Sequence, residues 1–195
     1  MLIKLKNSKL NMWKEDSKGL SYVEMVIGLA LLSGVLLIAY TFMSFTIKSN
    51  TYVSAKYDST QSARFAMNDM GNYIRRAKKV RYNETSYNAV VVNDDGDEIN
   101  IHVDIDNDGI CELVQYRLDD KKLVKGYAEL GRTPTTWYTV INCVYNYLLD
   151  SSKPIFIVDG YTVNIELYIK DEAESLSDPI CVNASYTIRS KGAME

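Results

Sequence analysis

The chain has 195 residues and a formal net charge of −3. This length fits one membrane segment plus one globular domain with its own core. Five lysines against Glu15 and Asp16 give the first 19 residues a charge of +3, so the rest of the chain carries −6. This acidic remainder argues against nucleic acid as the main partner, because phosphate recognition needs a basic surface.

An uncharged, mostly apolar run of 23 residues follows the basic segment, from Met25 to Ile47. About 20 apolar residues are enough for a helix to cross the hydrocarbon core of a membrane. The run is longer than the apolar core of a secretory signal peptide, which has about 7 to 15 residues. The lysine-rich flank predicts that the amino terminus is cytoplasmic and that the carboxyl-terminal domain is exported.

The junction between the two segments reads Lys18-Gly19-Leu20-Ser21-Tyr22-Val23-Glu24. It resembles the class III leader of type IV prepilins and of type II secretion pseudopilins. The resemblance implies that prepilin peptidase cuts after Gly19 and that Leu20 becomes the N-methylated mature start. It also implies that Glu24, the fifth mature residue, pairs with the terminal amine of a neighbouring subunit. The family usually begins with Phe-Thr, whereas this chain has Leu-Ser, and Tyr22 replaces the usual leucine.

Glu24 stands inside the apolar sequence. An ionisable group within a membrane helix is costly unless it is paired, and it marks a functional site. The plainer alternative is an ordinary membrane anchor with a glutamate near the interface. The glutamate also argues against the tip-most minor subunit of the family, which characteristically lacks it.

Beyond Ile47, apolar residues recur at spacings of three and four, which predicts that the same helix continues as an amphipathic stalk to about Lys79. The predicted stripe consists of Val53, Tyr57, Thr60, Ala63, Met67, Met70, Ile74, Ala77 and Val80. The first half of such a helix has no partner within one subunit, so it would contact lipid or identical helices in a filament. Gly28 and Gly34 would either loosen the helix or let those helices approach closely, and we favour close packing.

Short β-rich runs separated by Asp, Asn and Gly follow the stalk and predict an antiparallel meander. The four strands of this meander are Ala89 to Val92, Glu98 to Val103, Glu112 to Leu118 and Leu123 to Tyr127. Ile155 to Val158 is expected to pair with Tyr161 to Lys170 across Asp159-Gly160, and another strand follows at Cys181 to Arg189. Trp137 to Leu148 is ambiguous between strand and helix, although its composition favours a strand.

These elements predict an α+β fold with one long helix packed on an antiparallel sheet domain, which is also the pilin fold that the resemblance implies. The chain would consist of a cleaved leader (1–19), a transmembrane or filament-core half of the helix (20–47), an amphipathic half (48–80) and the β domain (81–195).

An acidic loop runs from Asp104 to Glu112, with further carboxylates at Asp106 and Asp108 and a glycine at Gly109. Its spacing resembles the first nine positions of an EF-hand or dockerin calcium loop. Position twelve, however, is Gln115 instead of a bidentate acid. A solvated hairpin turn is the interpretation we favour, and calcium binding by Asp104, Asp106, Asp108 and Glu112 is the alternative.

Three cysteines fall in the exported part, so one disulfide leaves one thiol over. The resemblance implies Cys143 with Cys181, because family members often close a carboxyl-terminal loop this way. Buried cysteines without a disulfide are the alternative.

The sequence offers no catalytic motif: His102 is its one histidine, expected as a surface or cross-strand residue, and no phosphate loop or metalloprotease motif is present. We therefore expect no enzyme and no required cofactor. The leading hypothesis is a minor type IV pilin that moves from the cytoplasmic membrane into an extracellular pilus. Its partners would be prepilin peptidase, other pilin subunits and the assembly machinery. The alternatives are a pseudopilin of a type II secretion or competence system and a single-pass membrane sensor.

Overall fold

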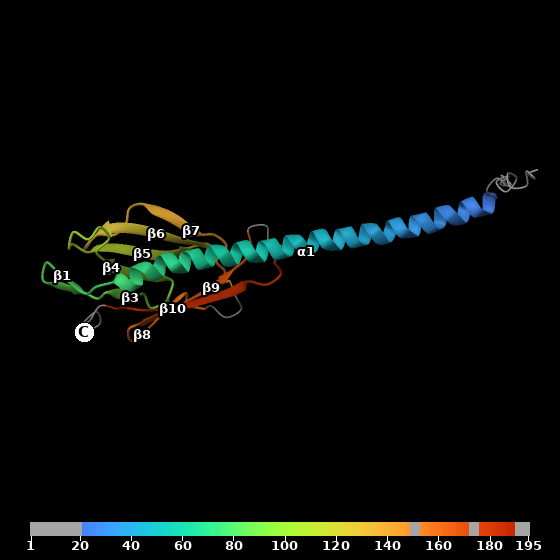
Figure 1. Ribbon diagram of the computed structural model, residues 1–195. Coiled ribbons are helices and arrows are strands. Elements are labelled where there is room, and N and C mark those ends of the chain that lie inside the picture. The colour runs from blue at the N-terminus through green and yellow to red at the C-terminus, as the bar shows by residue number, and fades with distance from the viewer. Residues whose placement is uncertain (1–20, 149–152, 172–175, 190–195) are drawn as a thin grey trace, which may run out of the picture. The chain divides into compact units, whose positions relative to one another are not determined.

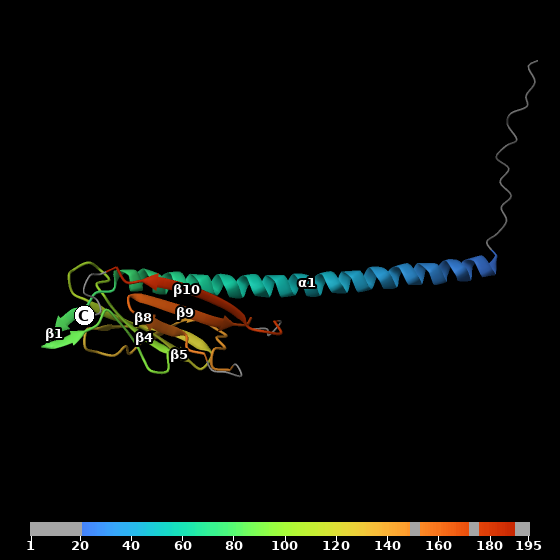
Figure 2. The same cartoon turned by 90° about the horizontal axis from the view of Figure 1, so that it is seen from below.

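The computed structural model describes residues 21–148, 153–171 and 176–189 (Figures 1 and 2). One long helix, α1 (Tyr22–Arg76), precedes all the described strands, which pair antiparallel, so the predicted α+β arrangement is confirmed. The chain divides between Lys48 and Ser49 into two compact units, and α1 contributes to both.

The described strands form three sheets. A five-stranded sheet has the order β3-β4-β5-β6-β7, a three-stranded sheet the order β10-β9-β8, and β1 pairs only with β2. The strands are β1 (Val80–Tyr82), β2 (Thr85–Tyr87), β3 (Val90–Val92), β4 (Glu98–Val103), β5 (Glu112–Asp119), β6 (Lys122–Glu129), β7 (Trp137–Ile141), β8 (Phe156–Asp159), β9 (Thr162–Ile169) and β10 (Ile180–Thr187). The predicted meander of four strands is confirmed as β3 to β6, and β7 extends it with the first part of the ambiguous segment, as a strand. The predicted pairing of β8 with β9 is confirmed as well. The separation of the three-stranded sheet from the other sheet and the β1-β2 hairpin were not predicted.

The end of α1 corrects one expectation from the sequence. The helix stops at Arg76 and does not continue to Lys79. The Ala77 N–H donates to the Ile74 carbonyl at 3.2 Å, and the Lys78 N–H donates to the His102 carbonyl at 2.9 Å. The backbone therefore leaves the helical hydrogen-bond pattern because β4 offers it another acceptor.

The core lies where α1 and the two larger sheets meet. On β9, Val163, Ile165, Leu167 and Ile169 are buried and alternate with less buried residues, as the sequence pattern predicted. On β4, Ile99 and Ile101 face the same core cluster. This alternation fixes the register of each strand, because a slip of one residue would turn the apolar set to solvent.

Burial along α1 begins at Ser59. From there the predicted stripe is confirmed at Ala63, Met67, Met70 and Ile74. Thr60 is only partly buried, and Val53 and Tyr57 are 60% and 66% exposed. The buried helical residues are Ser59, Ala63, Ala66, Met67, Met70, Gly71 and Ile74.

An ion pair and two tyrosine hydroxyl contacts hold α1 on the five-stranded sheet. The Lys125 ammonium lies 2.7 Å from Asp69 Oδ2, and the Tyr116 hydroxyl donates to the same oxygen at 2.8 Å. Burial raises the pKa of Tyr116, so this hydroxyl keeps its proton. The Tyr73 and Tyr127 hydroxyls lie 3.1 Å apart, and burial together with this hydrogen bond raises the pKa of Tyr73 to about 12.

A glycine lets β10 approach the other flank of α1 (Figures 1 and 2). The Tyr186 ring of β10 lies over Gly71, where an added Cβ would stand 2.3 Å from a ring carbon. The Arg75 guanidinium lies over the same ring, 5.0 Å from its centre. The helix and the three-stranded sheet are therefore joined at a close contact that only glycine permits.

Gly71→Ala should destabilise the protein, although alanine is the better helix former by about 1 kcal/mol. The reason is the overlap between the new methyl group and the Tyr186 ring. We expect a lower melting temperature by circular dichroism, and partial recovery in Gly71→Ala combined with Tyr186→Leu. Asn72→Ala, at the exposed neighbouring position, is the control and should be neutral or stabilising. A rise in melting temperature for Gly71→Ala would contradict the close contact.

Ile74→Asp should cost several kcal/mol of unfolding free energy, because it places a charge at a fully buried position. Asn72→Asp introduces the same side chain at an exposed position two residues away and should change stability by less than about 0.5 kcal/mol. Thermal melts of the two variants compare them directly. Equal losses would show that this face of α1 is assigned wrongly.

Candidate functional site

The apolar half of α1, residues 22–47, forms a continuous exposed apolar surface. Its large side chains, including Leu37, Phe42 and Phe45, are 66%, 71% and 70% exposed. Apart from the partly exposed Ser44, every residue from 21 to 50 is exposed. The helix is long and apolar enough to cross a membrane. A surface of this kind needs lipid or another protein to cover it.

Glu24 caps the beginning of this helix. Ser21 precedes the first helical residue, and its N–H donates to Glu24 Oε2 at 2.9 Å. Ser21 and Glu24 thus have the spacing of a capping box, in which the acid at the third helical position bonds back to the N-cap N–H. The Ser-x-x-Glu pattern was present in the sequence, but its capping role was not predicted. In one subunit, Glu24 already has a hydrogen-bond donor.

The predicted processing residues, Gly19 and Leu20, lie outside the described residues, which begin at Ser21. Cleavage after Gly19 would leave the Leu20–Ser21 peptide bond intact, so the N–H that Glu24 accepts would survive it. Gly28 and Gly34 have open space where a Cβ would stand. Close helix packing at these two glycines stays a prediction.

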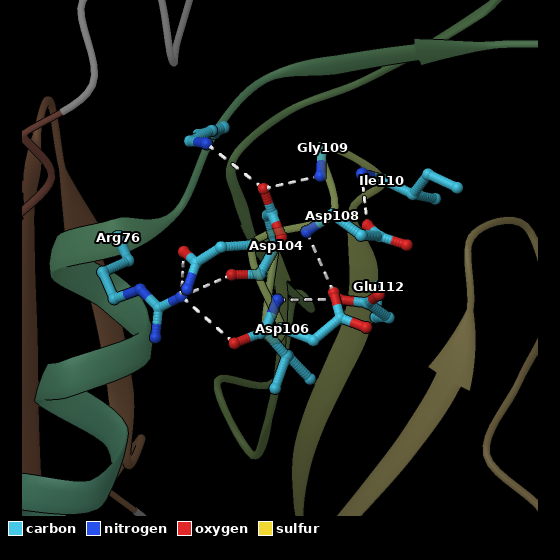
Figure 3. A network of polar contacts seen from close by, with 10 residues as sticks. Arg76, Asp104, Asp106, Asp108, Gly109, Ile110 and Glu112 are labelled. Carbon is cyan, nitrogen blue, oxygen red and sulfur yellow. Dashed lines mark hydrogen bonds and ion pairs between the residues drawn. The ribbon is translucent and has the colours of Figure 1, made fainter.

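The acidic loop joins β4 to β5 and brings three predicted ligands together. One carboxylate oxygen from each of Asp104, Asp106 and Asp108 lies within 4.8 Å of the others (Figure 3). Asp104 is buried, whereas Asp106 and Asp108 are exposed. Gly109 has a φ of 92°, a left-handed conformation that glycine adopts without strain. It allows the sharp turn that folds the three carboxylates inward.

Each aspartate of the loop also accepts a backbone hydrogen bond (Figure 3). The Gly109 N–H donates to Asp104 Oδ2 at 3.2 Å, and the Ile110 N–H donates to Asp108 Oδ1 at 2.7 Å. Asp106 Oδ1 accepts from the Asp108 N–H at 3.2 Å. These contacts shape the hairpin turn between β4 and β5.

Glu112 lies outside the group of three. Its Oε2 accepts from the Ile105 N–H at 2.9 Å, which ties the first residue of β5 across the base of the loop. Gln115 lies within β5 and is 8% exposed. The loop therefore contains no bidentate acid at position twelve.

Two cations from the end of α1 lie beside the loop. Arg76 Nη2 donates to the carbonyl oxygens of Asp104 and Ile105 and to Asn107 Oδ1 (Figure 3). Lys78 Nζ lies 3.7 Å from Asp104 Oδ2. The sequence placed Arg76 off the apolar stripe but did not indicate this contact, because it depends on where α1 ends relative to β4.

The structure has no disulfide between Cys143 and Cys181, contrary to the pairing that the resemblance implied. The two residues line grooves on different flanks of α1. Cys143 borders a groove of about 930 Å³ together with Asp58 and Ser62, and Cys181 borders another together with Thr60 and Arg64. At about 100° per residue, these two helical sets point in nearly opposite directions. Burial raises the pKa of the Cys181 thiol.

His102 is a structural residue. It is 5% exposed, so the expectation of a surface position was wrong, while its cross-strand place opposite Leu113 is confirmed. Its Nδ1 lies 2.6 Å from the Asn88 carbonyl oxygen, and its ring lies 5.3 Å from that of Tyr87. Burial lowers the pKa of His102, which keeps the imidazole neutral near pH 7.

No protein-family model matches the chain, and no curated protein matches it.

Proposed function

We propose that the protein is a minor pilin, a low-abundance subunit of a type IV filament. The lysine-rich segment before Gly19 stays in the cytoplasm, the apolar half of α1 holds the subunit in the membrane, and the β domain lies outside. Prepilin peptidase removes the leader, and the apolar half then moves from lipid into the filament. The protein works by assembly and has no catalytic turnover.

The observation that carries this proposal is the combination of Lys18-Gly19, a glutamate five residues after the glycine, and an exposed apolar helix. An ordinary membrane anchor needs only the helix. The α+β fold, in which the second half of α1 packs on sheets while the first half is uncovered, also supports a subunit that assembles through its helix. A pseudopilin shares the same features and would assemble in the same way.

The cap at Glu24 indicates which partner the carboxylate has before assembly and why it would gain a better one in the filament. An unpaired carboxylate in the hydrocarbon is costly, by about 2.5 to 3.5 kcal/mol at the centre of a membrane helix and by less at its first turn, where Glu24 lies. In the single subunit, the Ser21 N–H offsets part of this cost. After cleavage, a neighbour's terminal amine would add a full charge to the same carboxylate, which is stronger than a neutral hydrogen bond. The gain in pairing favours one axial register between subunits.

The first test concerns the leader. We predict a mature chain that begins at Leu20, measured as intact mass in membrane and filament fractions from cells with a working prepilin peptidase. Gly19→Val should retain the leader, because a larger side chain blocks the cut. Gly28→Ala, a matched change where nothing lies within 4 Å of the added methyl, should be processed normally. A dominant unprocessed wild-type chain would refute the proposal.

The second test separates the two roles of Glu24. Glu24→Gln keeps an acceptor for the Ser21 N–H but removes the charge, whereas Glu24→Val removes both. Both variants should be processed and remain in the membrane, and both should be depleted from sheared filaments, as measured by quantitative immunoblotting. Wild-type levels of Glu24→Gln in filaments, with loss of Glu24→Val alone, would show that capping suffices and that no charge pair forms.

A further inference from the structure

One buried carboxylate oxygen in the acidic loop has no protein partner. Asp104 Oδ1 is inaccessible to solvent and accepts no hydrogen bond from any residue that the structure describes. The Asp104 side chain as a whole is 8% exposed. The other oxygen, Oδ2, takes both the Gly109 N–H and the Lys78 ammonium. An unsatisfied, buried carboxylate oxygen is destabilising, and a bound cation is one way to satisfy it.

The negative charges around this oxygen outnumber the positive ones by the charge of one divalent cation. Asp104, Asp106, Asp108 and Glu112 contribute four negative charges, and Arg76 and Lys78 contribute two positive charges. Arg76 donates to carbonyl and amide oxygens, so it leaves the carboxylates available. Lys78 is 55% exposed and 3.7 Å away, which makes its pairing with Asp104 weak. The remaining charge of −2 matches one divalent ion.

We propose that this loop binds a calcium ion through Asp104, Asp106 and Asp108. Calcium lies at about 2.3 to 2.6 Å from its oxygen ligands, so two ligands on opposite sides of the ion stand about 5 Å apart. The three carboxylate oxygens lie within 4.8 Å of one another and fit inside that span (Figure 3). Glu112, at position nine of the loop, ligates through a water molecule, as this position often does.

The loop differs from a high-affinity calcium site in a way that sets its strength. Gln115 occupies the place of the bidentate acid and is held within β5. Without that ligand, the site belongs with the weaker extracellular class, whose dissociation constants are about 10⁻⁴ to 10⁻³ M. Magnesium binds more weakly than calcium, because it demands near-ideal octahedral geometry and gives up its water reluctantly.

A bound ion would also strengthen the attachment of the end of α1 to the acidic loop. Arg76, the last helical residue, contacts the backbone oxygens of Asp104 and Ile105, and these residues belong to the loop that the ion orders. Calcium binding would therefore stabilise the junction between α1 and the β4–β5 hairpin. The melting temperature of the whole chain would measure this stabilisation.

The experiment uses the full chain purified in detergent micelles, titrated with calcium chloride and with magnesium chloride by isothermal calorimetry. Thermal melts are recorded in chelator and in 10 mM calcium. The test variant carries Asp106→Asn and Asp108→Asn, both exposed. The matched control carries Asp94→Asn and Asp95→Asn, in the exposed turn before β4, and makes the same change in net charge.

We expect wild type and control to bind one calcium ion and to gain about 3 to 10 °C in melting temperature. The test variant should bind at least tenfold more weakly. In chelator it should melt at or above the wild-type temperature, because it relieves repulsion among the three clustered carboxylates. That result separates a lost ligand from a damaged fold.

Three results would overturn the site. The first is a wild-type chain that shows neither a heat of calcium binding nor a higher melting temperature in calcium. The second is a calcium-dependent rise in melting temperature that persists in the test variant. The third is binding of magnesium as tightly as calcium. None of these measurements depends on processing or filament assembly, so failure here leaves the proposed function to its own tests.

Discussion

The fold depends on α1, because both larger sheets pack against this helix and do not pair with each other. Asp69 binds Lys125 and Tyr116 of the five-stranded sheet, while Gly71 receives Tyr186 of the three-stranded sheet. Residues two positions apart on a helix point about 200° apart, so these neighbours serve different flanks. The stripe between the flanks fills the core. Removing the helix would expose the inner faces of both sheets.

The same helix lies in two environments, and sequence periodicity distinguished them well. The uncharged run to Ile47 and the stripe from Ala63 to Ile74 are strong signals, because one requires continuous apolar residues and the other requires spacings of three and four. The intermediate residues Val53 and Tyr57 were assigned wrongly to the buried stripe. Apolar spacing predicts which face is apolar, but it cannot show how far the sheets extend along it.

The strands were predicted nearly as well wherever a turn bounded them on both sides. Glu98 to Val103 coincides with β4, because Asp-rich turns flank it. The short strands β1 and β2 were missed, since they pair only with each other and Asn83 and Glu84 form their turn with positive φ values. The division into two larger sheets was also not visible, because it depends on tertiary contacts between segments remote in sequence.

In the candidate sites, local signals were readable and long-range ones were not. The carboxylate spacing of the acidic loop predicted its cluster of three aspartates, and Ser-x-x-Glu contained the cap at Glu24. The burial of Asp104 and the contact with Arg76 depend on where the helix ends relative to β4. No local sequence pattern indicates that position. The disulfide implied by the resemblance failed for the same reason, because α1 lies between the two cysteines' surroundings.

The contact between Gly71 and Tyr186 also orders events in time. Gly71 lies in the first element of the chain, and Tyr186 lies in β10, the last strand that the structure describes. A contact between such distant residues forms slowly, because the two ends of a long chain segment must come together, at a cost in entropy, before the contact can stabilise the fold. The apolar flank of α1 therefore stays uncovered while the ribosome completes the strands that follow. A chain built this way reaches its final fold only after synthesis of β10.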